Sequence, residues 1–321
     1  MLELGKTGRK LINMDHGLSR IFGPVPSRRL GLSLGVDLIP HKTCSFDCVY
    51  CQIGRTTDKR IDPESFYSSE KIISEAKKYI PCSKAQTITL AGSGEPTLSK
   101  DLEEILRAIK EISHIPVALL TNGSLFWKPE IREASLIADI ILPTFSAARE
   151  ETFRRLHRPH PQLTLKKVIE GLQRLRDEYH GQIFLELMLV KGVNDDDQEI
   201  EALGRKIQEL APDKVQINTV VRPPSEPGTG PVSPHRLEEV KNFLGPRAEV
   251  VVATQEDRVA SKPSREVILL EMIRRRPLSA QDIQKVTGES LDHVNSLLTD
   301  LIAKGLIEEQ IHNGASYYKV K

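Results

Sequence analysis

The sequence predicts an α/β fold in which a partial (β/α)6 barrel is followed by a small C-terminal domain of three helices and a hairpin. From residue 34 to about 253, short β-branched runs alternate with amphipathic helical stretches, as in parallel strands joined by crossover helices. Near residue 254 this alternation stops at a polar segment. The first part offers six strand-helix units, or seven at most, so we expect an open barrel rather than the closed eight-stranded form.

The expected strands are short and apolar, and helical patterns separate them. Helical spacing of apolar residues is clearest in Leu102–Ile112 and around Val168–Leu175. The strands are GVDLI, TITLAG, VALLTN, IILPTF, FLELMLV and VQINTV, with AEVVVA as a possible seventh. Loops at the carboxyl ends of such strands usually build the active site, so RPPSEPGTGPVSPH after the sixth strand is either a lid or a plain surface loop.

The C-terminal pattern predicts a winged helix. Ile268–Ile273 mark a first helix, Ser279 caps a second, and Gly288 makes the turn before a third. Two strands around Asn313-Gly314, a dipeptide favoured in two-residue hairpins, form the wing. We therefore divide the chain into an N-terminal extension (1–33), the barrel (34–253), a linker (254–263) and a winged-helix domain (264–321).

Composition excludes several classes of protein. No stretch approaches the roughly 18 apolar residues of a membrane span, and the first twenty residues lack a signal-peptide core, so we expect a cytoplasmic protein. Net charge is +1, but residues 1–60 hold ten Lys or Arg against five Asp or Glu. A basic rim of this kind suits an anionic substrate or is an ordinary solvated surface.

Three of the four cysteines form one motif, which indicates a metal site in a reducing compartment. Cys44, Cys48 and Cys51 have C-x3-C-x2-C spacing on the loop after the first strand. Three thiolates can hold three corners of a cubane iron-sulfur cluster and leave the fourth iron open. The alternative is structural zinc, with His41 as the obvious fourth ligand, although zinc sites favour paired C-x2-C elements. Cys82 is left over.

A second motif ends the second strand. Ala91-Gly92-Ser93-Gly94-Glu95-Pro96 places a glycine-flanked carboxylate at the same face of the barrel as the cysteine loop. The glycines would let a ligand approach the backbone, and Glu95 could accept hydrogen bonds from a cationic amine. The two motifs in this order favour the cluster over zinc.

With both motifs in place, the sequence resembles the radical S-adenosylmethionine (SAM) superfamily. Its marks are a three-cysteine loop with an aromatic residue before the last cysteine, here Tyr50, and a glycine-glutamate motif on the next strand, here with Gly92, Gly94 and Glu95. The resemblance implies a TIM-like barrel, one oxygen-sensitive [4Fe-4S] cluster on Cys44, Cys48 and Cys51, S-adenosyl-L-methionine as cofactor, and an electron donor such as flavodoxin or ferredoxin. It also implies a 5′-deoxyadenosyl radical that abstracts hydrogen from a substrate.

Further residues at strand ends resemble SAM-contacting positions of the superfamily. Asn122 and Ser146 could bond ribose hydroxyls, and Met188 and Asn194 follow on the fifth strand and beyond it. Each has a plain structural alternative, because Asn-Gly is a common turn, Asn194-Asp195 a common helix cap and Met188 a suitable core residue.

More narrowly, FGPVPSRRLGLSLGVDLIPHKTCSFDCVYCQIGRTT, HRPHPQLTL, LVKGVND and NTVVRPP resemble the wyosine-type tRNA synthetase-like branch of the superfamily. Members that build the wyosine base carry a second cluster on further cysteines. Only Cys82 remains here, so we expect a single cluster and do not carry that activity over. Arg28, Arg29, Lys42 and Arg222 are candidates to hold an anion near the mouth of the barrel.

The predicted winged helix is electrically neutral, with eight Lys or Arg and eight Asp or Glu in residues 264–321, which argues against DNA binding. We therefore expect an enzyme that modifies an RNA or a peptide or protein. The alternative is an iron-sulfur transcription regulator that senses redox state, which would leave the GSGEP motif and the barrel unexplained.

Overall fold

The computed structural model describes residues 19–27, 29–251, 269–270, 272–273 and 276–320. Its centre is a curved sheet of eight strands in the order β1-β2-β5-β6-β7-β8-β9-β10, parallel throughout from β2 to β10. The strands are β1 (Ile21–Ser27), β2 (Gly31–Val36), β5 (Thr87–Leu90), β6 (Val117–Thr121), β7 (Ile140–Pro143), β8 (Gln182–Leu189), β9 (Lys214–Thr219) and β10 (Ala248–Val250). The predicted α/β fold with a parallel sheet is confirmed, including the possible seventh strand.

Strand β1 was not expected. It comes from the segment assigned to an N-terminal extension and pairs antiparallel with β2 at the edge of the sheet. Its sequence contains Pro24 and Pro26, which lack a backbone N–H and read as turn signals. Proline is tolerated at a sheet edge, and a shift in register between Phe22 and Val25 accommodates the interruption.

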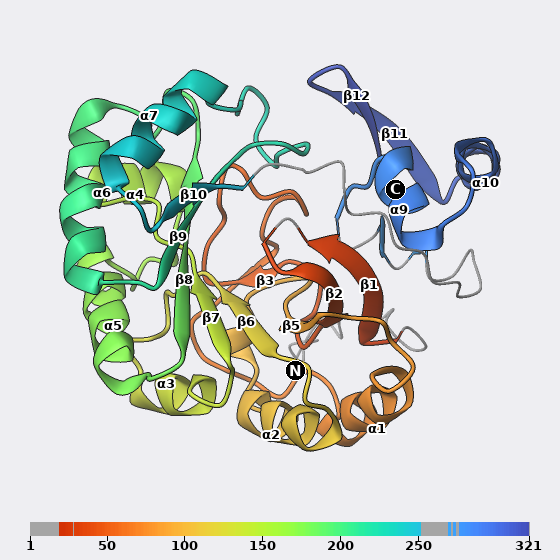
Figure 1. Cartoon of the computed structure of the whole chain (residues 1–321), viewed down its shortest axis with the longest axis horizontal. Helices are drawn as coiled ribbons and strands as arrows, with labels where there is room; N and C mark the ends of the chain where they lie inside the picture. Colours follow the sequence, from red (N-terminus) through yellow and green to blue (C-terminus); the bar gives the residue numbers. More distant parts are fainter. Residues whose placement is uncertain (1–18, 28, 252–268, 271, 274–275, 321) are drawn as a thin grey trace, which may run out of the picture.

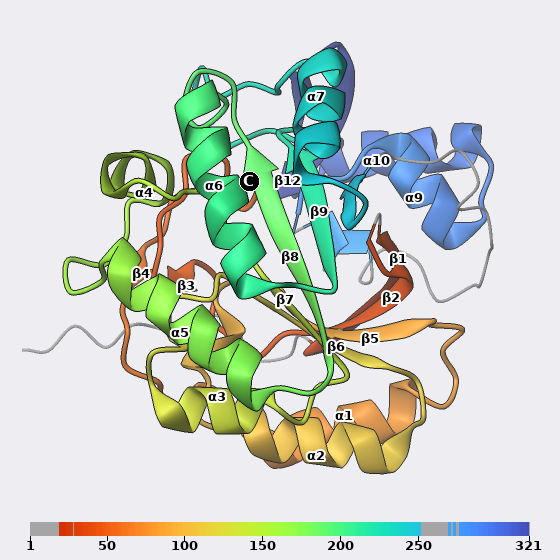
Figure 2. The same ribbon diagram turned by 60° about the vertical axis from the view of Figure 1, so that its left-hand side comes forward.

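The helices of the barrel cover the outer face of the sheet (Figure 1). In α2, Leu102, Ile105, Leu106 and Ile109 are buried, as their spacing predicted. Figure 2 shows α5 and α6 lying along the outside of β8 and β9. The helices are α1 (Ser69–Tyr79), α2 (Leu102–Ile112), α3 (Pro129–Ser135), α4 (Glu150–His157), α5 (Leu165–Glu178), α6 (Asp197–Leu210) and α7 (Pro234–Leu244). In the part of the chain that the structure describes, no helix has both the length and the apolar character to cross a membrane.

The described C-terminal residues, 269–320 with their gaps, form a module beside β1 (Figure 1). Ser279 caps α9 (Ala280–Thr287) through a capping box with Asp282, and α10 (Leu291–Ala303) follows. Strands β11 (Ile307–His312) and β12 (Ala315–Val320) form an antiparallel hairpin whose turn residues, Asn313 and Gly314, both have positive φ. The predicted linker 254–263 and Ile268 lie outside the described residues.

The C-terminal module packs directly on the barrel. Val25 of β1 belongs to the same apolar cluster as Leu269, Met272 and Leu298. The Tyr317 hydroxyl donates a hydrogen bond of 2.9 Å to the carbonyl of Val221, in the loop after β9. These contacts fix the module next to the carboxyl ends of the barrel strands, where ligands bind in folds of this kind.

Candidate functional site

The loop that carries the three cysteines is anchored from two sides. Cys44 ends the two-residue strand β3 (Thr43–Cys44), which pairs with β4 (Asp58–Lys59). The amides of Asp47 and Val49 donate to the carbonyls of His157 and Leu156 at the end of α4. Backbone bonds to the GSGEP turn hold the other side. The loop is therefore positioned by the fold before any metal binds.

Each of the three thiols lies against a different polar group. The Lys42 ammonium is 3.3 Å from Cys51 Sγ, and the Nδ1 atom of His157 is 3.2 Å from Cys48 Sγ. The side-chain nitrogen of Asn122, Nδ2, is 3.5 Å from Cys44 Sγ. Because each thiol has its own neighbour, the loop presents three separately oriented sulfur atoms.

Burial and mutual proximity make these thiols hard to ionise alone. Burial, together with the nearby charges of Glu95 and Cys51, raises the pKa of Cys44 from 9.0 to about 12. Burial, followed by the charges of Cys44 and Cys51, raises the pKa of Cys48 well above its ordinary value. These thiols would ionise more readily beside a positive charge, which an iron-sulfur cluster bound to them would supply. In the described ranges, no set of three or more His, Cys, Asp or Glu side chains is arranged to hold one metal ion.

His157 lies among aromatic side chains beside the three-cysteine loop. Its ring stacks on Phe46 at a centroid distance of 4.9 Å and lies edge-on to Tyr50. Burial lowers the pKa of His157 to about 3, so the imidazole is neutral. With the proton on Nδ1, the ring donates a hydrogen bond to the Cys48 sulfur, as histidines beside metal-site residues often do. Sequence analysis quoted its segment, HRPHP, but gave the histidine no role.

The GSGEP turn sits directly against the cysteine loop. A Cβ atom on Gly94 would lie 1.9 Å from the carbonyl oxygen of Thr43, so only glycine fits there. The Lys42 amide donates to the Ser93 carbonyl at 2.7 Å, and the Glu95 amide donates to the Thr43 carbonyl at 3.1 Å. The expected close approach at Gly94 is present, but the approaching group is the protein's own backbone.

Glu95 is buried, and its carboxylate ties the ends of two strands together. One oxygen accepts hydrogen bonds from the Thr97 amide and hydroxyl and from the Thr121 hydroxyl, and the other accepts one from the Asn122 amide. Burial raises the pKa of Glu95, whereas these hydrogen bonds lower it. Glu95 does not line the cavity that reaches Cys51, described below, and its contact with an amine stays a prediction.

The other predicted cofactor residues divide into two groups. Tyr50, Gly92 and Met188 line one cavity together with Cys51. Ser146 and Asn194 do not line it and are buried. The Ser146 hydroxyl accepts a hydrogen bond of 2.8 Å from the backbone amide of Met188. The side-chain amide of Asn194 donates hydrogen bonds to the backbone carbonyls of Ser146 and Met188. The geometry of Ser146 and Asn194 suits holding Met188 in place.

Asn122 lies beside the three-cysteine loop. Its side-chain nitrogen is 2.8 Å from the Ser45 hydroxyl, and its oxygen accepts from the Ser124 amide. It therefore supports the first residue after Cys44, and its predicted bond to a ribose stays a prediction.

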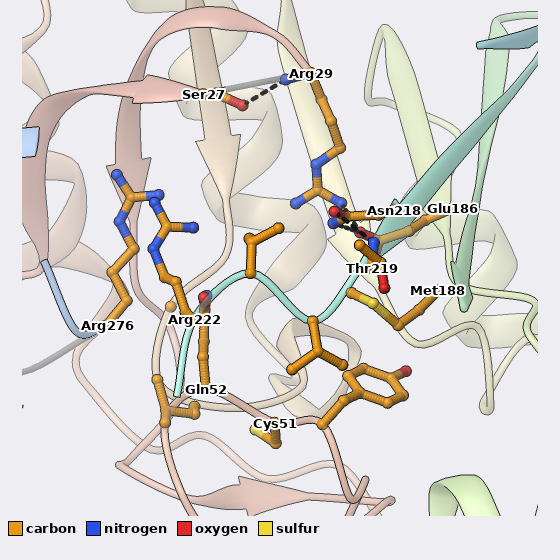
Figure 3. Close-up of a pocket in the computed structure, with 15 residues that line it drawn as sticks. Ser27, Arg29, Cys51, Gln52, Glu186, Met188, Asn218, Thr219, Arg222 and Arg276 are labelled. Atoms are coloured by element: carbon orange, nitrogen blue, oxygen red, sulfur yellow. Dashed lines mark hydrogen bonds and ion pairs between the residues drawn. The ribbon is translucent and has the colours of Figure 1, made fainter. Parts of the chain in front are cut away.

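The cavity that reaches Cys51 has a volume of about 280 Å³ and lies between the barrel and the C-terminal module. Figure 3 shows its polar walls. Arg29 lies next to Glu186 and Asn218 on one side, and Arg222 and Arg276 lie on the other. The Arg29 guanidinium is 2.6 Å from the Glu186 carboxylate. Of the four basic candidates, Arg29 and Arg222 line this cavity, Lys42 is buried beside Cys51, and Arg28 lies outside the described residues.

Glu186, Asn218 and Arg276 are among the cavity residues that sequence analysis did not assign to the site. Glu186 is a charged residue inside an apolar strand, two positions before Met188 and therefore on the same face of β8. The alternation of side chains along β8 could therefore have predicted that Glu186 faces the cavity. No sequence pattern could have placed Arg276 there, because it belongs to the C-terminal module.

Comparisons with known proteins agree on the first part of the chain. The radical SAM superfamily matches residues 38–203. The UPF0026 protein MJ1312 of Methanocaldococcus jannaschii is 32% identical over 307 residues, which cover 92% of this chain and 94% of that protein. A protein of Brachyspira hyodysenteriae named GTPase Obg is 35% identical over all of this chain, which spans 47% of that relative's length. Among solved structures, a radical SAM methyltransferase from Sphaerobacter thermophilus superposes with a TM-score of 0.50 at 19% identity, covering 68% of this chain and 65% of that one.

Proposed function

This chain is an enzyme of the radical SAM superfamily and, within it, is related to the UPF0026 proteins, and from that premise we propose that it cleaves S-adenosylmethionine reductively to modify a further substrate. In this proposal Cys44, Cys48 and Cys51 hold one [4Fe-4S] cluster. When bound there, the cluster would provide one electron for cleavage of the sulfur-to-ribose-carbon bond, which releases methionine and a 5′-deoxyadenosyl radical. A small reductant protein such as flavodoxin or ferredoxin would deliver that electron.

The observation that carries the proposal is the cavity that opens beside Cys51. Tyr50 and Met188 give it an apolar part, and Gly92, Thr219 and the Arg29–Glu186 pair give it a polar part. S-adenosylmethionine has the same division, with an aromatic base at one end and a charged amino acid at the other. A cavity with both kinds of wall next to one thiol suits the cofactor.

In this proposal the remaining predicted residues support the walls of the cavity from outside it. Glu95 holds the GSGEP turn against β6 and leaves one carboxylate oxygen with a single protein donor, the Asn122 amide. Asn122 supports the cluster loop, and Ser146 and Asn194 hold Met188. These residues would exclude water and keep the cofactor oriented.

We also propose that the C-terminal module is a winged helix that helps recruit the substrate, an RNA or a peptide or protein. Its described order is helical residues, α9, α10 and a hairpin. Leu278 forms an isolated antiparallel bridge to Tyr318 through two backbone hydrogen bonds of 3.1 and 2.8 Å, at the place where a winged helix has a short strand beside its hairpin. No observation favours the redox-sensing regulator.

The kinship with the wyosine-type branch is proposed on the sequence motifs, with a single cluster. The one cysteine outside the motif, Cys82, is exposed and follows α1. The low cysteine count also underlies our proposal of a cytoplasmic, reducing location.

Anaerobic reconstitution tests the function. The full chain is loaded with iron and sulfide, reduced with dithionite and given S-adenosylmethionine, and 5′-deoxyadenosine is measured by chromatography. We expect formation that requires both cluster and reductant. An intact cluster with no 5′-deoxyadenosine, even when cell extract is added as a source of substrate, would contradict the proposal.

A further inference from the structure

We propose that Arg222 and Arg276 form a binding site for a phosphate group of the substrate, at the junction of the barrel and the C-terminal module. The inference rests on the proposed function, because it assigns a substrate class to the cavity beside Cys51. It goes further by giving the C-terminal module a direct part in the active site.

The two arginines reach the cavity from different parts of the chain. Arg222 lies three residues after β9, and Arg276 lies just before the Leu278–Tyr318 bridge of the C-terminal module. Both line the cavity, and Figure 3 draws their guanidinium groups next to each other on the wall opposite Arg29. Cys51 and Gln52 of the cysteine loop line the same cavity.

Arg222 is a mostly buried arginine with a hydrogen-bond donor that an anion could satisfy. Its side chain is only 11% exposed, and its buried Nε atom has no hydrogen-bond partner. Its Nη2 atom is 3.7 Å from the Asp282 carboxylate, longer than a hydrogen bond. The same Asp282 oxygen accepts from the Ser279 amide in the cap of α9, so this carboxylate is already partly used. A buried guanidinium with an unsatisfied donor normally acquires a partner.

The balance of charge in the cavity points the same way. Its lining contains Arg29, Arg222 and Arg276 against one acidic residue, Glu186. Glu186 lies 2.6 Å from Arg29 and is therefore committed to that arginine. Arg222 and Arg276 lie on the opposite wall, where the low exposure of Arg222 reduces screening by water. A bound anion there would reduce the repulsion between the two guanidinium groups.

The number and shape of the donors favour phosphate over carboxylate. One guanidinium already satisfies a planar carboxylate through its fork of two N–H groups. A tetrahedral phosphate has three terminal oxygens and up to two negative charges, so it can accept from two guanidinium groups at once. The site therefore selects a terminal phosphate, which carries more charge than an internal phosphodiester.

Titration calorimetry on the reconstituted full chain tests this inference with inorganic phosphate and inorganic pyrophosphate as probes. We expect saturable binding to the wild-type protein that weakens as salt rises. Arg222→Gln and Arg276→Gln should each raise the dissociation constant about 10-fold or more, since each removes a charge-assisted bond. Arg276→Lys keeps the charge without the fork and should fall between wild type and Arg276→Gln. Arg107→Gln, which removes an exposed arginine paired with Glu103 on α2, is the matched control and should bind like wild type.

Two further arms identify the source of the phosphate. A 5′-phosphorylated mononucleotide and an oligoribonucleotide without terminal phosphates are titrated under the same conditions, and arginine-dependent binding of the mononucleotide alone supports a terminal phosphate. The absence of saturable phosphate binding to the wild-type protein would refute the site. Equal phosphate binding by the wild type and by both Gln variants would also refute it, provided that the variants melt at the same temperature as the wild type. Formation of 5′-deoxyadenosine by the same wild-type preparation is a separate measurement, so failure of the proposed function is distinguished from failure of the phosphate site.

Discussion

Gly94 offers a sharp test of how the cluster loop is positioned. In Gly94→Ala the new methyl carbon would lie 1.9 Å from the Thr43 carbonyl oxygen and 2.6 Å from the Ile39 side chain. A carbon and a carbonyl oxygen in contact lie about 3.3 Å apart, so the two segments would have to separate by about 1.4 Å. Thr43 immediately precedes Cys44, the first cysteine of the motif, so this movement would displace Cys44.

The expected cost follows from the contacts that would break. Overpacking in a tight site costs about 1–3 kcal/mol. Separating the segments also stretches the bond from the Glu95 amide to Thr43 and the bond from the Lys42 amide to Ser93, each worth about 1 kcal/mol. We therefore expect Gly94→Ala to lose about 3–5 kcal/mol of unfolding free energy and most of its bound iron.

Urea denaturation of the metal-free protein measures the stability, and iron and sulfide analysis after anaerobic reconstitution measures the cluster. Gly230→Ala is the matched control, because a methyl group there meets nothing within 4 Å, and it should behave like wild type. If Gly94→Ala unfolds at the same urea concentration as Gly230→Ala and holds as much iron, the turn does not position the cluster loop and our reasoning is wrong.

Three other variants test separate parts of the site and the fold. Cys48→Ala should abolish cluster incorporation, whereas Cys82→Ala, at an exposed position, should leave iron content nearly unchanged; equal iron loss in both would exclude a single cluster on the three-cysteine loop. His157→Phe keeps an aromatic ring beside Cys48 but removes its hydrogen-bonding nitrogen, so we expect cleavage about 10-fold slower at a fixed dithionite concentration, and an unchanged rate would assign His157 a packing role only. Glu178→Gln removes one charge from the two-pronged pair with Arg132, which is buried, and should cost about 1 kcal/mol in urea denaturation. Because the Arg132 hydrogen bond lowers the pKa of Glu178 from 4.5, the wild type should lose this contribution as the pH falls through the lowered value; a difference between the two proteins that stays constant down to acid pH would contradict the assignment.

Sequence reasoning predicted the parts of the molecule that depend on local pattern. The spacing of apolar residues in Leu102–Ile112 predicted which side chains α2 buries. The Asn313-Gly314 turn and the Ser279 cap were found because each depends on a few neighbouring residues. Strand β1 was missed, because its prolines are acceptable only at a sheet edge, and edge position is a property of the assembled sheet.

The candidate site shows the same division. The sequence by itself determined the three-cysteine loop, the GSGEP motif and their order on a parallel sheet, because these signals lie in short segments. Only the tertiary structure decided that Gly94 accommodates backbone, that Asn194 holds Met188, and that Arg222 and Arg276 line one cavity. Hydrogen bonding and charge act between atoms that are close in space, and residues far apart in the sequence become neighbours only when the sheet curves and the C-terminal module packs on β1.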